Sequence, residues 1–384
     1  MNRPAAPFSC TRLFERDREL EAIADALDRL EQGTGSFFVI EGPAGIGKSR
    51  LVAAAGKLAR GRGVEVLSAR GTELESAFSF GVVRQLFEPA LARLYPPERA
   101  ELFEGSAAPA GRLLFPSGSA QERIDPGDAG ALSLAHSLWW LTANLARRSP
   151  LLLSLDDAHW TDATSLKFFG YLLHRVEGVP VVVVVSVRTG EPASGVLNDL
   201  RGEPAALLSL QALTEDGTRD MAVSRLDRPA DPAFVDSLHR TTRGNPLLLN
   251  ETLRTVAEQK IPADAEGALK IASLELPSVS RTVLARVRRL GPEAVALAQA
   301  VAVWGGRAEL HQAAAVAGID RASAGRAADL LAAVEILQRG RPLEFAHPLV
   351  HKAVYADIAP AFKAEGHALA AGILKEAAAP VERS

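Results

Sequence analysis

Cysteine is almost missing from this chain of 384 residues, and its scarcity excludes two kinds of structure. Cys10 is the single cysteine, so the chain cannot form an internal disulfide bond. A cysteine-based zinc site needs several such residues and is excluded as well. We therefore expect a reducing, cytoplasmic setting, and we expect any bound metal to have oxygen ligands.

Long hydrophobic runs and an excess of charge of one sign are also missing. The longest β-branched run, at 181–187, is far too short to cross a bilayer, and the N-terminus lacks the apolar core of a signal peptide. Lys and Arg together number 43 and Asp and Glu 46, which gives a formal net charge of −3. The composition therefore predicts no membrane association and no general attraction to nucleic acid.

The order of the hydrophobic patterns predicts an α/β domain over residues 1–210. Helical stretches, the first starting at Asp17, alternate with short apolar runs that are typical of buried strands. The expected strands lie at 36–41, 64–70, 151–155, 181–187 and 206–210. Strands that are apolar on both faces indicate a parallel sheet covered by helices on each side. The segment 96–128 is rich in Pro, Gly and Ser, and we expect it to be an irregular insertion.

Strand patterns nearly disappear after about residue 211, where the chain changes domain type. We expect helices at 214–226, 232–242 and 246–260, followed by a linker at 261–268. A second, mostly helical block follows the linker. The predicted domains are therefore 211–268, 269–360 and a C-terminal helix or tail at 361–384.

A phosphate-binding loop is the strongest signal in the chain. The sequence "GPAGIGKS" at 42–49 matches G-x-x-x-x-G-K-[ST] and lies between a predicted strand and a predicted helix. Backbone N–H groups of such a loop surround the phosphates, Lys48 reaches the β- and γ-phosphates, and the Ser49 hydroxyl binds Mg²⁺. The alternative is an ordinary glycine-rich turn. The residues predicted to bind nucleotide here are Gly42, Pro43, Ala44, Gly45, Ile46, Gly47, Lys48, Ser49 and Arg50.

Two adjacent carboxylates follow the apolar run "LLLSL". Asp156 ends this strand at the carboxyl edge of the sheet, where it can hold Mg²⁺ through water. Asp157 is suited to orient an attacking water, so we predict a catalytic role for it together with Lys48. The alternative is that Asp157 only caps the next turn.

Two further features fit a nucleotide site. Arg188 ends the strand "VVVVVSVR" at the same edge of the sheet, so it could sense the γ-phosphate; a salt bridge to a surface acid is an equal alternative. "RGNPLLLNE" at 243–251 places a rigid Gly-Asn-Pro start on a helix, although an ordinary capped helix explains the same residues.

Six segments in this order resemble one known family. They are "FERDRELEAI", "GPAGIGKSRL", "FSFGVVRQLFEP", "LLLSLDDAHWTDATSL", "GNPLLLNETL" and "FAHPLVHKAVYADI". Together they resemble the nucleotide-binding region of the large ATP-binding regulators of the LuxR family, which are signal-transduction ATPases with numerous domains, related to AAA+ and origin-recognition-like ATPases. The resemblance implies that 211–268 is a helical lid and 269–360 a winged-helix-like domain. Nucleotide held among the three modules would set an off or an on state.

The resemblance also implies roles for individual residues. Arg16 is similar in position to the residue near the adenine or ribose, and Pro246 to the lid proline that lies against the adenine. Arg188 is similar to the sensor at the end of a strand. His347 corresponds to a winged-helix histidine that contacts the β-phosphate of ADP, although a structural histidine is the alternative.

The chain departs from this family at its end, because it stops at Ser384 without the helical repeats and the DNA-binding helix-turn-helix. We expect a fragment, a stand-alone switch subunit or a shortened gene product. A cluster of arginines at 281–289 is a candidate for nucleic-acid contact but more simply forms a solvated helix face. We therefore do not expect direct DNA binding. We expect a protein partner or nucleotide-dependent self-association instead.

The functional prediction is a switch that binds ATP or ADP with Mg²⁺ and hydrolyses ATP slowly in the service of transcription regulation. The adjacent acids favour hydrolysis, and the lid and winged-helix blocks favour gating. The alternatives are a stand-alone AAA+-like ATPase and a non-catalytic nucleotide-binding interaction module.

Overall fold

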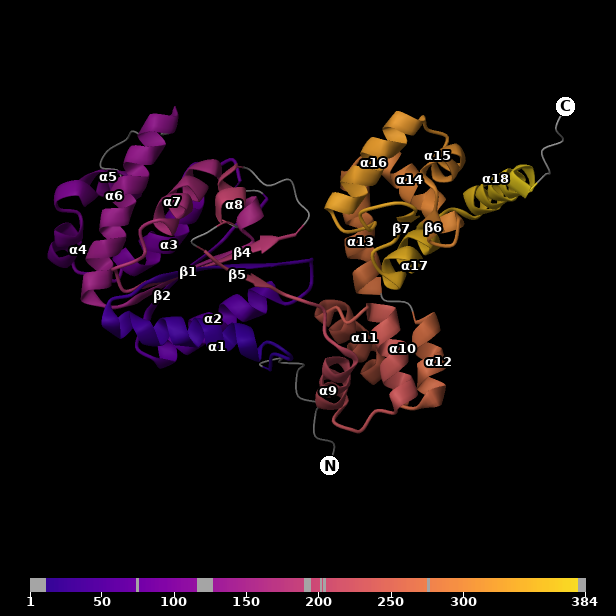
Figure 1. The fold of residues 1–384 in the computed structure, drawn as a ribbon, viewed down its shortest axis with the longest axis horizontal. Helices are drawn as coiled ribbons and strands as arrows, with labels where there is room; N and C mark the ends of the chain where they lie inside the picture. Colours follow the sequence, from indigo (N-terminus) through magenta and orange to yellow (C-terminus); the bar gives the residue numbers. More distant parts are fainter. Residues whose placement is uncertain are drawn as a thin grey trace. The chain divides into compact units, whose positions relative to one another are not determined.

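The computed structural model describes residues 12–73, 76–115, 127–189, 195–200, 202, 205–274 and 277–378. The chain divides into two compact units (Figure 1). The first comprises residues 12–43 and Gly47–Gln211, and the second comprises Ala44–Ile46 and the described residues from Ala212 onward. The two units are described separately.

A five-stranded sheet forms the centre of the first unit. Its strands are β1 (Ser36–Gly42), β2 (Glu65–Arg70), β3 (Leu151–Asp156), β4 (Val181–Arg188) and β5 (Ala206–Ser209). All neighbours are parallel in the order β2-β3-β4-β1-β5, so β4 separates the loop-bearing β1 from the acid-bearing β3. The first seven residues of β4 are buried, as expected for a valine-rich strand in the middle of a covered sheet.

Helices cover both faces of this sheet. They are α1 (Asp17–Asp28), α2 (Lys48–Gly61), α3 (Gly81–Leu91), α6 (Gly127–Arg148), α7 (Ala163–Leu173) and α8 (Gly195–Leu200), with short 3-10 helices η1 (Arg29–Gln32) and η3 (Ala158–Trp160). In Figure 1, α1 and α2 lie on one side of the sheet, and α3, α6 and α7 lie on the other. Alternate strand residues such as Val39, Leu153 and Val183 share a core with α3, α6 and α7. The predicted parallel α/β fold is confirmed.

The prediction of an irregular insertion at 96–128 is wrong over its first part. Residues 96–114 form α4 (Pro96–Leu102), η2 (Gly105–Ala107) and α5 (Ala108–Leu114). The prolines begin α4 and α5 within the first two positions, where a missing N–H is tolerated. Leu102, Leu113 and Leu114 are buried in the core cluster that includes α6. Residues 116–126 of the predicted insertion lie outside the described residues.

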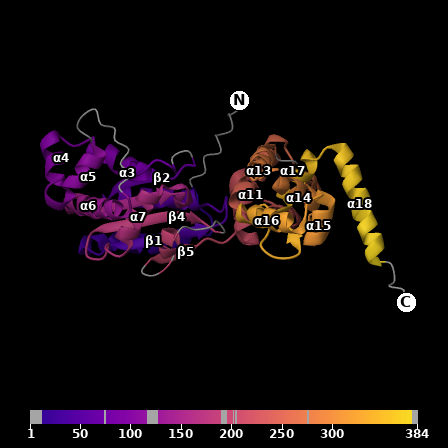
Figure 2. The ribbon, with the colours of Figure 1, turned by 90° about the horizontal axis from the view of Figure 1, so that it is seen from above.

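The second unit is mostly helical. Its elements are α9 (Glu215–Leu226), α10 (Pro232–Thr242), α11 (Pro246–Glu258), α12 (Ala265–Ser273), α13 (Pro277–Arg289), α14 (Pro292–Val303), β6 (Arg307–Ala308), α15 (Leu310–Ala317), α16 (Arg321–Ala333), β7 (Leu343–Glu344), α17 (Pro348–Asp357) and α18 (Pro360–Ala378). Strands β6 and β7 pair antiparallel, and α18 packs on α14 and α15 (Figure 2). The assignments of 211–268 as a lid and 269–360 as winged-helix-like stay predictions.

The predicted linker at 261–268 is wrong in its second half. Asp264 caps α12 by accepting a hydrogen bond from the Gly267 N–H at 3.0 Å, so the helix begins at Ala265. At the C-terminus, α18 ends at Ala378, and residues 379–384 of the predicted helix or tail lie outside the described range. Every described helix is too short or too polar to span a bilayer.

Candidate nucleotide-binding site

The phosphate loop joins the end of β1 to the start of α2. Gly45 and Gly47 have φ angles of 77° and 107°, a left-handed conformation that side chains other than glycine rarely adopt. Lys48 is only 7% exposed, and its Nζ donates to the carbonyl oxygens of Gly42 at 2.7 Å and Pro43 at 2.9 Å. The lysine charge is therefore held at the loop, where phosphate oxygens would be attracted to it.

Helix α2 begins without a capping side chain and without an acidic residue in its first turn. Helices α7 and α11, in contrast, begin with side-chain caps from Asp162 and Asn245. No carboxylate of α2 itself therefore neutralises the positive dipole end of this helix or accepts hydrogen bonds from its first N–H groups. This is the arrangement that favours an anion at a helix N-terminus. Ser49 and Arg50 are exposed in this first turn.

The first acid after β3 is tied to the neighbouring strand. The Ser186 hydroxyl on β4 donates to Asp156 Oδ1 at 2.6 Å and accepts from the Asp157 N–H at 2.9 Å. This pair of bonds fixes the backbone at the strand end. The second oxygen of Asp156, Oδ2, lies 3.9 Å from Arg70 Nε.

Asp157 does not cap the following turn. It occupies the N-cap position of η3 with φ of 53°, but its side chain makes no capping bond. Instead, Arg70 at the end of β2 donates from Nε and Nη2 to Asp157 Oδ2 at 3.1 and 2.8 Å. The capping alternative is thus wrong, and the hydrogen bond to Asp157 raises the pKa of Arg70.

Arg70 was not predicted from the sequence as a site residue. Its position is set by sheet register, because Arg70 and Asp156 are directly paired across β2 and β3. The signal that could have revealed it is the charged residue at the end of the predicted strand 64–70, at the same edge as the acids.

Arg188 ends β4 beside the phosphate loop. Its register partner on β1 is Gly42, and the neighbouring Thr189 N–H donates to the Gly42 carbonyl at 3.3 Å. The structure therefore brings the start of the loop, Lys48, the acid pair and Arg188 to one edge of the sheet. Sensing of the γ-phosphate by Arg188 stays a prediction, and a surface salt bridge stays its alternative.

Arg16 has a structural position in the first unit. It is 5% exposed, and its guanidinium donates to the carbonyl oxygens of Glu15 at 2.7 Å and Gln211 at 2.6 Å. Burial lowers the pKa of Arg16. These bonds fasten the start of α1 to the segment after β5, and the predicted contact with adenine or ribose stays a prediction.

Pro246 is the first residue of α11 in the second unit. Asn245 caps this helix, because its Oδ1 accepts from the N–H groups of Leu247 at 3.0 Å and Leu248 at 3.3 Å. Gly244 precedes the cap with φ of 68°, and a Cβ there would lie 2.1 Å from the Leu213 carbonyl oxygen. The Gly-Asn-Pro sequence thus has a complete structural explanation, and adenine contact by Pro246 stays a prediction.

His347 precedes α17 in the second unit. Burial, and then the nearby Arg243 charge, lower its pKa from 6.5 to about 4. Arg243 is held there by donating to the Ala346 carbonyl at 2.8 Å and to Glu344 at 3.0 Å. Because His347 stays neutral at physiological pH, any contact it makes with a phosphate would use a neutral imidazole N–H.

We expect His347 to make stability depend on pH between about 6.5 and 4. In this window the unfolded chain binds a proton that the folded chain excludes, so stability falls as the pH falls. The loss for this one group should be on the order of 2–3 kcal/mol at pH 4. Urea unfolding at pH 7 and at pH 4.5 should therefore show a smaller pH effect in His347→Asn than in wild type. His311→Asn, at an exposed histidine, is the control and should show the wild-type pH effect. A pH effect in His347→Asn as large as that in wild type would refute this assignment.

The donors at this edge of the first unit suit Mg²⁺ rather than a softer metal. The Ser49 hydroxyl and the Asp156 carboxylate are hard oxygen ligands, and the Ser186 hydroxyl orients one oxygen of that carboxylate. The residues present therefore fit the predicted metal, and the roles of Ser49 as a direct ligand and of Asp156 through water stay predictions.

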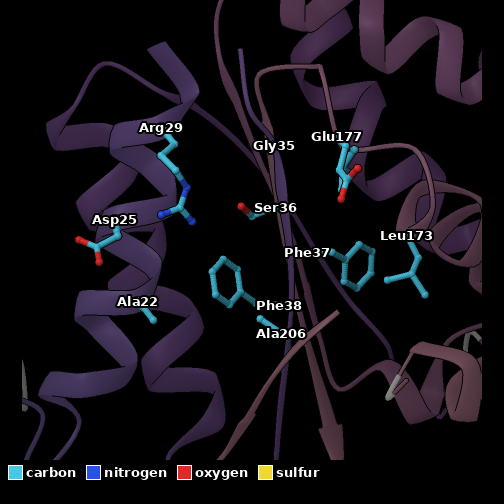
Figure 3. A pocket seen from close by; sticks show the side chains of 11 residues that line it. Ala22, Asp25, Arg29, Gly35, Ser36, Phe37, Phe38, Leu173, Glu177 and Ala206 are labelled. Atoms are coloured by element: carbon cyan, nitrogen blue, oxygen red, sulfur yellow. The ribbon is translucent and has the colours of Figure 1, made fainter. Parts of the chain in front are cut away.

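A separate cavity of about 380 Å³ lies at the opposite end of β1 (Figure 3). Arg29 and Asp25 approach it from one side of the strand, and Leu173 and Glu177 approach it from the other. The cavity is lined by Ser36 at the amino end of β1, whereas the phosphate loop follows the carboxyl end. It is therefore not the nucleotide site.

Residues 12–185 match the family model of the AAA ATPase domain. The chain is similar in structure to the Walker-type ATPase PABY2304 of Pyrococcus abyssi, with a TM-score of 0.58 and 13% identity over 91% of this chain and 99% of that one. The first unit has the fold of a P-loop ATPase. The match covers the loop, the acid pair and most of β4.

Two further proteins are similar. The Orc1 protein of Aeropyrum pernix, solved in complex with DNA, has a TM-score of 0.49 and 16% identity, covering 92% of this chain and 95% of that one. An uncharacterized protein of Rhizobium meliloti, R02095, is 26% identical over 375 residues, which cover 89% of this chain. This chain spans 35% of the length of that relative.

Proposed function

We propose that the chain is a regulatory ATPase switch: it binds ATP or ADP with Mg²⁺ and hydrolyses ATP slowly. The observation that carries this proposal is the group at the carboxyl edge of the sheet, where Lys48, Asp156, Asp157 and Arg188 come from two strand ends and one helix start. The match to the AAA ATPase domain supports nucleotide binding and ATP hydrolysis.

The chemistry can be divided among these residues. Lys48 and the first N–H groups of α2 bind the phosphates, and Arg188 responds to the γ-phosphate. Mg²⁺, held by Ser49 and Asp156, would neutralise phosphate charge. Asp157 orients the attacking water, and its carboxylate is itself oriented by Arg70 at 2.8 Å.

The regulatory part of the proposal concerns the second unit. By resemblance to the LuxR-type regulators, Arg16 lies near the adenine or ribose, Pro246 lies against the adenine, and His347 contacts the β-phosphate of ADP. His347 has a pKa of about 4, so in this proposal it would contact the phosphate as a neutral imidazole. A stand-alone AAA+-like ATPase remains the second candidate, supported by the same group of residues at the sheet edge.

The two candidates differ in their response to nucleotide. For a switch, limited proteolysis of the full chain should cut the 259–264 segment, between α11 and α12, at different rates with ADP and with a non-hydrolysable ATP analogue. Pro246→Ala should abolish this difference and weaken ATP and adenosine binding alike. Identical cleavage with both nucleotides, in a protein that binds both, would leave the simple ATPase as the better description.

A further inference from the structure

The tip of the phosphate loop, Ala44–Ile46, groups with the second unit. The side-chain amide of Asn245 donates to the Ala44 carbonyl at 2.9 Å, and the Leu247 N–H donates to the Gly45 carbonyl at 3.2 Å. A Cβ at Gly45 would lie 2.8 Å from Asn245 Oδ1, so this approach is close as well as hydrogen-bonded. The start of α11 therefore holds two carbonyl groups of the loop.

A carboxylate of the second unit takes an N–H group of the same loop tip. The Ala44 N–H donates to Glu335 Oε2 at 2.6 Å. Backbone N–H groups of a phosphate loop are the groups that surround the phosphates of a nucleotide. A hydrogen bond to a carboxylate is about twice as strong as one between neutral groups. Glu335 thus places a negative charge at a loop that is built to receive one.

The backbone of Glu335 has a conformation that favours glycine. Glu335 follows α16 with a φ of 61°, and the Ile336 N–H closes the helix end by donating to the Leu331 carbonyl at 2.9 Å. Helix α15 closes with the same kind of bond, and there the left-handed residue is Gly318 with a φ of 67°. A glycine at position 335 would therefore remove the carboxylate without straining the helix end.

The arginines of α13, which the sequence made candidates for nucleic-acid contact, have partners inside this unit. Arg288 donates to both Asp357 oxygens at 2.9 and 3.0 Å, and Arg286 donates to the Val334 carbonyl at 3.3 Å. The second of these bonds holds the residue that precedes Glu335. Helix α13 therefore helps to fix the helix end from which Glu335 reaches the loop.

A cavity of about 500 Å³ adjoins this contact, and both Ala44 and Glu335 line it. Its charged lining also includes Glu251 and three arginines, Arg254, Arg281 and Arg286. Basic residues thus outnumber acidic ones around the cavity. A Glu335 carboxylate that leaves the loop has both room and positive charge beside it.

We propose that Glu335 competes with nucleotide phosphates for the loop and makes the site favour ADP over ATP. This inference rests on the proposed nucleotide-binding function of the loop. A phosphate group near the Ala44 N–H must displace the carboxylate or lie beside it. Displacement costs the hydrogen bond, and proximity costs like-charge repulsion. The cost is larger for ATP, because ATP carries one more phosphoryl group and more negative charge than ADP.

The test is isothermal titration calorimetry of the full chain with Mg-ATP and with Mg-ADP. Glu335→Gln keeps the size of the side chain and removes its charge. We expect the dissociation constant for ATP to fall by about 10-fold or more in this variant, because a charge-assisted hydrogen bond no longer competes with the phosphates. The dissociation constant for ADP should fall less. Glu335→Gly should show the same order of effects in a folded protein.

The contact also has a readout in the nucleotide-free protein. Hydrogen exchange measured by mass spectrometry should be about 10-fold or more faster at Ala44 in Glu335→Gly than in wild type, because the amide loses its acceptor. Equal exchange would show that Glu335 does not hold the loop and would overturn the proposal.

Asp329→Asn is the matched control for the titrations. Asp329 lies on α16 and is exposed, and its substitution removes one negative charge without touching the cavity lining. The control should bind both nucleotides like wild type, and equal tightening in the control would overturn the proposal. Unchanged or weaker ATP binding in Glu335→Gln, beside a wild type that binds ATP, would overturn this inference alone. Absence of nucleotide binding in wild type and in every variant would refute the proposed function as well.

Discussion

Nucleotide binding should be lost in Lys48→Ala while the fold is retained. The Lys48 Nζ makes two hydrogen bonds to loop carbonyls, and it supplies the positive charge closest to the predicted phosphates. A charge-assisted hydrogen bond is worth about 1.5–3 kcal/mol, so loss of two phosphate contacts should weaken ATP binding by at least about 100-fold. Isothermal titration calorimetry with Mg-ATP measures this directly.

Lys57→Ala is the matched control for this experiment. Lys57 lies on the same helix α2, but its side chain is exposed and lies more than two turns from the loop. The control should bind ATP like wild type. A folded Lys48→Ala protein with wild-type affinity would remove the phosphate-loop assignment and, with it, the proposed ATPase switch.

Much of the first unit could be predicted because its signals are contiguous in sequence. The phosphate loop needs only a strand, a glycine-rich turn and a helix in succession, and 36–61 contains all three. Asp156 follows directly from an apolar run that ends in an acid. The parallel sheet followed from runs such as "VVVVV", which few other environments accommodate.

Parts that depend on register or on short helices could not be predicted in the same way. Arg70 and Ser186 reach the acid pair from strands β2 and β4, which lie on either side of β3 only in the folded sheet. Helices α4 and α5 have seven residues each, too few for a clear hydrophobic period, and their prolines suggested a loop. For α12, the cap at Asp264 was present in the sequence but was included in the expected linker.

Other residues show that a motif can have a complete structural explanation without losing a functional one. Asn245 and Gly244 account for the start of α11 by capping and by close backbone approach. Arg16 is likewise explained by its bonds to two carbonyls. Binding measurements with adenosine on variants of Arg16 and Pro246 test the proposed base contacts of these segments.

Hydrolysis should be much slower in Asp157→Asn, whereas ATP binding should be unchanged. The Asp157 side chain makes no capping bond, so the substitution removes no helix cap, and its ion pair with Arg70 is partly exposed and contributes little to stability. Loss of a group that orients or activates water typically lowers the rate by about 10²- to 10⁴-fold. Single-turnover hydrolysis of radiolabelled ATP separates this chemical step from product release.

Three further variants divide the roles at this edge of the sheet. Asp156→Asn should weaken Mg²⁺-dependent binding, because a neutral amide is a poor partner for a hard dication.

Arg70→Gln should lower the single-turnover rate less than Asp157→Asn does, without changing ATP affinity, because Arg70 acts by positioning the carboxylate. Arg70→Lys should restore part of that rate. Asp28→Asn is the matched control, since Asp28 forms a similar exposed pair with Arg62 at 2.7 Å, outside the nucleotide site. Turnover in Asp157→Asn equal to that of wild type and of Asp28→Asn would reject the catalytic role and leave nucleotide binding as the function of this edge.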